Sequence, residues 1–206
     1  MDDLSCFRLR NVLSCILEGV VRNGDKTVES QPVTRFTALA APNISIRDYM
    51  ERIYKYSKCS VECLVLGLIY IDRFIQSSGI QVNSLTVHRV LLTSVVIAAK
   101  TFDDDFYTNT HYARVGGIPP EELALLEMDF LFNIHFSLYV SCEDYQRYYE
   151  EIYKHATMYC NQCKGMDLPR LTWKSRSNEG SCLQYGKGLG IRDDSPTNVN
   201  FNASDY

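Results

Sequence analysis

Two successive segments of this chain are apolar on nearly every side, and they restrict the possible folds more than any other feature. Residues 61–75 and 87–99 are broken only by scattered polar or charged side chains. A helix that is apolar all round lies either inside a domain or in a membrane. The uncharged runs in these segments are far shorter than the roughly 20 residues that a membrane span needs. We therefore expect both segments to be central helices of an all-α domain.

Signals for further helices lie on both sides of these segments. Residues 4–21 place apolar side chains at intervals of three and four, which predicts an amphipathic helix. Ser45 followed by Asp48 is a capping-box pattern and opens the next helix. The proline pair at 119–120 predicts the start of another helix. The stretch that follows Ser141 should form a last helix, reaching about residue 158.

This pattern predicts three parts of the chain. Residues 1–43 would be an N-terminal amphipathic helix with a linker, and residues 44–160 a compact array of five helices. Residues 161–206 are rich in Gly, Ser and Asn and lack any apolar periodicity. Such a composition is typical of a flexible, mostly disordered tail.

The distribution of charge argues against a nucleic-acid partner. Residues 61–160 carry six basic and thirteen acidic side chains. A surface that binds a duplex has to neutralise phosphates with clustered Lys and Arg. The N-terminal stretch does not resemble a secretory signal. We expect an intracellular protein of the nucleus or cytoplasm, with neither a nucleic acid nor a membrane as partner.

Five sequence strings carry a resemblance to a known family. Residues 69–74 (IYIDRF), 96–102 (VIAAKTF) and 125–131 (LLEMDFL) resemble the second, third and fifth helices of a cyclin box. Residues 82–89 (VNSLTVHR) and 108–118 (TNTHYARVGGI) are similar to the plant P-type, or U-type, cyclins and to the fungal phosphate-response cyclin. The resemblance covers about residues 35–160.

The resemblance implies a fold of five helices and a non-enzymatic function. A cyclin binds a cyclin-dependent kinase and holds its C-helix in the active position, which places the catalytic Lys and Glu of the kinase together. The kinase would be of the PSTAIRE type or of the phosphate-response type. The alternative is a cyclin-fold interaction or transcription-factor module that activates no kinase. No cofactor is implied.

The resemblance also implies two pairs of site residues. Lys100 and Glu127 match the Lys and Glu that cyclins present to the kinase C-helix. An intramolecular salt bridge between them is the simpler interpretation, and both can hold at once. Asp72 matches a cyclin-box Asp that pairs with an Arg on the first helix of the box, and Arg47 is the candidate partner for a structural salt bridge.

A possible metal site lies beyond the last predicted helix. Cys160 and Cys163 form a CxxC pattern, with His155 before it and Cys182 after it. Zinc sites commonly combine two well-spaced pairs of ligands, whereas Cys182 stands alone. We therefore interpret these residues as free thiols at a helix end and predict no metal. No set of residues forms a recognisable catalytic arrangement.

Overall fold

The computed structural model describes residues 3–164, 166, 168 and 190–191. Helices dominate this part of the chain, as the sequence predicts. In chain order the elements are α1 (Asp3–Gly24), the 3₁₀ helix η1 (Asp25–Ser30), α2 (Ile46–Ser57), α3 (Val61–Ser78), α4 (Val87–Phe102), β1 (Asp105–Phe106), α5 (Asn109–Gly116), α6 (Pro120–Asn133), α7 (Cys142–Lys154), the π-helical turn η2 (His155–Tyr159) and β2 (Gly190–Ile191). Strands β1 and β2 form one short parallel pair, which the sequence did not predict.

The helix starts follow from short-range side-chain chemistry. The hydroxyl of Ser45 accepts a hydrogen bond from the backbone N–H of Asp48, which confirms the predicted start of α2. Ser141 makes the same contact at the start of α7. These hydroxyls satisfy backbone N–H groups that the first turn of a helix leaves free. Pro120 occupies the first turn of α6, as predicted.

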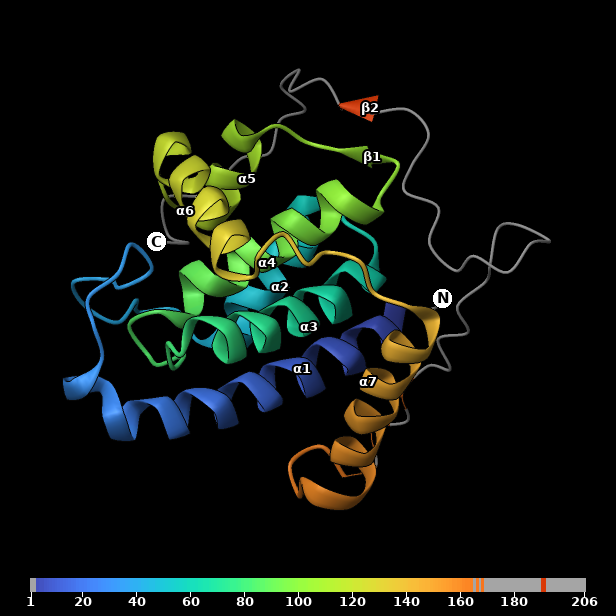
Figure 1. The fold of residues 1–206 in the computed structure, drawn as a ribbon. Helices are drawn as coiled ribbons and strands as arrows, with labels where there is room; N and C mark the ends of the chain where they lie inside the picture. Colours follow the sequence, from blue (N-terminus) through green and yellow to red (C-terminus); the bar gives the residue numbers. More distant parts are fainter. Residues whose placement is uncertain (1–2, 165, 167, 169–189, 192–206) are drawn as a thin grey trace.

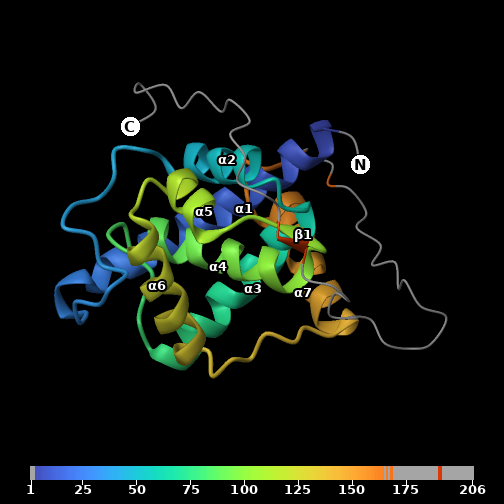
Figure 2. The same ribbon diagram turned by 90° about the horizontal axis from the view of Figure 1, so that it is seen from above.

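Helices α3 and α4 form the centre of the molecule, as the apolar segments predict. Eleven of the sixteen residues of α4 are buried, and ten of the eighteen residues of α3. Helix α4 packs against α2, α3, α5 and α6, and Figure 2 shows these helices grouped around it. The all-α fold with two enclosed helices is therefore confirmed.

The N-terminal part of the chain belongs to the same core. Helix α1 packs along α2 and α3 and runs across one side of the molecule (Figure 1). Leu9, Val12 and Leu13 of its apolar stripe are each at most 1% exposed. Phe36 from the segment after η1 is also buried, with its ring centre 5.0 Å from that of Phe74. Burial of this kind is the main source of stability in a domain.

Helix α6 ends in an unusual backbone conformation. His135 and Phe136 both have positive φ angles, 51° and 54°. This left-handed region is sparsely populated by residues other than glycine. From α3, Tyr70 donates a hydrogen bond to the carbonyl of Leu138, and Arg73 donates one to the carbonyl of Ser137. The connector between α6 and α7 is thus fixed against α3.

The end of α7 and the following residues are also packed. Regular α-helix ends at Lys154, and η2 continues it with a bond from the N–H of Cys160 to the carbonyl of His155. Cys163 and Leu168 are buried. The predicted flexible tail otherwise lies outside the described residues, apart from β2. Within the described residues, none of the helices is both long enough and apolar enough to cross a bilayer.

Candidate functional site

Lys100 and Glu127, the two residues implied to face a kinase, lie in direct contact. The Nζ atom of Lys100 lies 2.7 and 2.9 Å from the two carboxylate oxygens of Glu127. Asn109 completes the cluster: its side-chain oxygen accepts from Lys100 and its amide donates to Glu127 at 2.5 Å. The intramolecular salt bridge is therefore formed, and Asn109 is a member that the sequence did not reveal.

Three helices bring this cluster together at one edge of the fold. Lys100 lies in the last turn of α4, where a cation interacts favourably with the helix dipole. Asn109 begins α5, and Glu127 lies in the middle of α6. The side chains of Lys100 and Glu127 are 28% and 12% exposed. A carboxylate has about four acceptor positions, so Glu127 can still accept hydrogen bonds from a second chain.

Helix α6, which carries Glu127, also has an exposed apolar surface. We call it the α6 ridge, and it consists of Leu125, Met128, Phe132 and Phe136, which are 43–60% exposed. The opposite side of α6, including Leu126 and Phe130, is fully buried. Spacings of three and four residues place Leu125, Met128 and Phe132 on one side of the helix, and the ring of Phe136, from the turn after α6, lies 5.3 Å from that of Phe132. A contiguous exposed apolar patch of this kind marks an interaction site more often than a monomer surface.

The predicted salt bridge between Arg47 and Asp72 is not formed. Arg47 is exposed on α2, and the described residues include no ion pair between it and Asp72. Asp72 instead accepts hydrogen bonds from the hydroxyl of Tyr148 in α7 and, at 2.7 Å, from Gln76. The prediction failed because α3 turns this carboxylate toward α7, whereas α2 packs on α1, α4 and α5.

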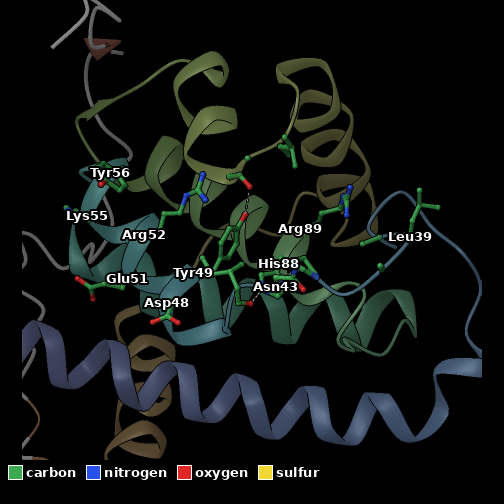
Figure 3. A pocket seen from close by; sticks show the side chains of 17 residues that line it. Leu39, Asn43, Asp48, Tyr49, Glu51, Arg52, Lys55, Tyr56, His88 and Arg89 are labelled. Atoms are coloured by element: carbon green, nitrogen blue, oxygen red, sulfur yellow. Dashed lines mark hydrogen bonds between the residues drawn. The ribbon is translucent and has the colours of Figure 1, made fainter. Parts of the chain in front are cut away.

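A separate groove of about 830 Å³ lies between residues 38–44, α2, the start of α4 and the end of α5 (Figure 3). His88 bonds the carbonyl of Ile44 at 3.0 Å, and Tyr49 donates to the carbonyl of Gly116 at 3.1 Å. Burial lowers the pKa of His88 and raises that of Tyr49. These polar groups join the walls of the groove to one another, and they form no nucleophile–base pair.

The candidate metal ligands are only partly those that the sequence singled out. His155, Cys160 and Cys163 do lie together, but the fourth member of the cluster is Cys15 of α1. Cys182, the fourth candidate from the sequence, lies outside the described residues. The distance along the chain explains why Cys15 was missed, since only the packing of α1 beside η2 brings it close.

Comparison with known proteins identifies the family of the chain. The sequence matches the cyclin family over residues 12–138. Cyclin-U4-1 of Arabidopsis thaliana is 42% identical over 151 residues, which cover 71% of this chain and 75% of that protein. Cyclin-P4-1 of Oryza sativa subsp. japonica is 40% identical over 172 residues, covering 80% of this chain and 81% of that protein.

A third relative matches over a smaller share. Cyclin-P3-1 of Oryza sativa subsp. japonica is 45% identical over 141 residues, which cover 66% of this chain and 60% of that protein. The chain belongs to the cyclin family, and within it to the plant P-type or U-type cyclins. Cyclins are regulatory proteins, and membership implies a kinase partner in general terms.

Proposed function

We propose that this cyclin binds a cyclin-dependent kinase through the Lys100–Glu127 cluster and the α6 ridge, and that binding activates the kinase. The observation that carries the proposal is that α6 contributes to a half-buried ion pair while four apolar side chains of α6 and the turn after it are exposed. Interfaces of high affinity combine apolar anchors with a few desolvated polar groups. The kinase C-helix would cover the ridge, while its backbone or polar side chains bond Lys100 and Glu127.

Activation requires that the cyclin binds one kinase conformation better than another. The kinase transfers phosphate efficiently only when its C-helix has swung inward and its Lys–Glu pair is formed. A partner that shifts the inward state from 1% to 99% needs about 5.5 kcal/mol of differential binding. Burial of the α6 ridge against an inward C-helix is an adequate source of this energy, because large apolar side chains gain about 1.5–3 kcal/mol each on full burial.

The proposal makes the chain a regulator that has no catalytic activity of its own and that works inside the cell, in the nucleus or cytoplasm. Two kinase types fit the resemblance of its sequence: the PSTAIRE type and the phosphate-response type. Control of cell division and control of the phosphate response are the corresponding roles.

The test is affinity purification from plant tissue with the wild-type chain and a Met128→Glu, Phe132→Glu variant. Both side chains are exposed, 55% and 60%, so the change should leave the fold intact. A charge buried against an apolar partner costs several kcal/mol. We expect a cyclin-dependent kinase to co-purify with the wild type and to be at least tenfold depleted with the variant. Val33→Glu, at a side chain that is 86% exposed and outside the ridge, is the matched control.

The activity of the purified complex separates the proposal from its alternative. The wild-type chain should raise phosphorylation of a histone substrate by the co-purified kinase at least tenfold, and the chain alone should phosphorylate nothing. A kinase that binds without gaining activity would favour an interaction module. Phosphorylation by the isolated chain would contradict the regulatory role.

A further inference from the structure

A cluster of three thiols and one imidazole lies far from the proposed kinase surface. Cys15, His155, Cys160 and Cys163 each offer one ligand atom, and these four atoms lie within 4.8 Å of one another. The Sγ atoms of Cys15 and Cys160 are 3.3 Å apart. Four soft or borderline donors at such distances are the ligand set of a structural zinc site.

The dimensions of the cluster suit a tetrahedral ion. With Zn–S bonds of about 2.3 Å, the sulfur atoms of a tetrahedral site lie about 3.8 Å apart. The one printed S–S distance, 3.3 Å, is shorter than this value, and no two ligand atoms are more than 4.8 Å apart, so small side-chain rotations suffice to close the site. The Cys160–Cys163 spacing, with two residues between the thiols, is that of the CxxC half of many zinc sites.

The local backbone is shaped to present three of the four ligands. The π-helical turn η2 joins the N–H of Cys160 to the carbonyl of His155 at 3.0 Å. A π turn at the end of an α-helix is rare and frequently occurs at functional sites. The next turn bonds the N–H of Cys163 to the carbonyl of Cys160 at 3.2 Å. His155, Cys160 and Cys163 therefore follow one another on successive tight turns.

His155 supplies an independent sign of a missing ligand. Its Nε2 atom is buried and has no hydrogen-bond partner among the described residues. A buried polar atom without a partner costs about 1–3 kcal/mol, and a metal ion would remove that cost.

We propose that Cys15, His155, Cys160 and Cys163 bind one Zn²⁺ ion, which ties the middle of α1 to the end of α7. Binding forms three Zn–S bonds and one Zn–N bond, and each thiol releases its proton to solvent. Three thiolates and Zn²⁺ leave the site with a net charge of −1. The ion would fasten the C-terminal end of the cyclin fold, where Figure 1 shows α7 leading into a turn beside α1.

The test is the metal content of the full chain, purified without added metal and without oxidation. We expect elemental mass spectrometry to find one zinc ion per chain. Chemical blocking of the thiols should release this zinc. Replacement of zinc by cobalt should give the visible bands of a tetrahedral site and a thiolate-to-cobalt charge-transfer band. A wild-type chain that carries no zinc and gives no tetrahedral cobalt spectrum would overturn the proposal.

Substitutions at the proposed positions test which side chains bind the ion. Cys163→Ala and His155→Ala should lower the zinc content and the cobalt bands at least tenfold. His155→Cys keeps four donors, and it should retain the metal while intensifying the charge-transfer band. Cys6→Ala, at another buried thiol of α1, is the control and should bind as the wild type does. Zinc that survives in both Cys163→Ala and His155→Ala, or a Cys15–Cys160 disulfide in place of the ion, would also contradict the site.

Discussion

The hydroxyl of Tyr148 in α7 donates a hydrogen bond to the carboxylate of Asp72 in α3. Burial and the bond to Asp72 raise the pKa of Tyr148 to about 12, so the phenol remains a donor throughout the physiological range. The carboxylate that the family resemblance assigned to a salt bridge with α2 thus holds the last helix against the centre of the fold. Its removal should affect the docking of α7.

We expect Asp72→Asn and Tyr148→Phe each to lower the free energy of unfolding by about 1.5–3 kcal/mol, the usual value for a hydrogen bond to a charged group. The double variant should lose less than the sum, because both changes remove the same bond. Urea unfolding measures these energies. Arg47→Ala should change stability by no more than about 0.5 kcal/mol, as exposed sites do. A large loss of unfolding free energy in Arg47→Ala would instead support the Arg47–Asp72 salt bridge.

Glu127→Ala should separate binding from stability. The carboxylate is assigned to the kinase interface, and truncation of a desolvated charge there costs about 2–5 kcal/mol, or at least thirtyfold in affinity. Lys100 keeps Asn109 as a partner, so the melting temperature should fall by only a few degrees. Titration of the co-purified kinase and a thermal melt measure the two effects. Glu151→Ala removes an exposed ion pair with Lys154 and is the control; equal weakening in both variants would refute the assigned role.

Phe36→Ala tests whether the segment between η1 and α2 is part of the core. The side chain is 1% exposed and packs against Phe74 and Phe130. Loss of a buried aromatic ring costs about 3–5 kcal/mol. Val33→Ala, three positions earlier and 86% exposed, should be nearly neutral. Equal stability of the two variants in urea would show that the segment is a linker.

Stability should fall as the pH drops through the range where histidine titrates. Burial lowers the pKa of His88 from its ordinary 6.5, so below about pH 6.5 the unfolded chain binds more protons than the folded one. The contribution of His88 to the free energy of unfolding is therefore complete above about pH 6.5. It is lost as the pH falls toward the lower pKa that His88 has in the folded protein.

His88→Gln should therefore show a smaller loss of unfolding free energy than the wild type between about pH 7.5 and 5.5. Urea unfolding at several pH values provides the comparison. A variant whose stability depends on pH as steeply as that of the wild type would mean that His88 is not the group responsible.

Local sequence patterns were sufficient to predict the helices and where several of them begin. Ser45, Ser141 and Pro120 act on backbone groups within three or four residues, so a local pattern is sufficient to predict their effect. The continuous apolar segments likewise predicted buried positions for α3 and α4, because both segments are apolar on nearly every side. The cyclin strings then implied Lys100 and Glu127, which the structure brings into contact.

Contacts between residues that are distant in the sequence depend on how the helices pack. Cys15 and Cys160 are 145 positions apart, and their contact depends on how α1 lies beside the end of α7. Asp72 faces α7 rather than Arg47 because the rotation of α3 about its axis is set by packing on α1, α4 and α7 together. The apolar residues of α6 divide into a buried side and the exposed α6 ridge for the same reason. The identity of an apolar side chain does not specify which residues will pack against it. Whether it lies in the core or on an exposed interface therefore becomes clear only in the packed fold.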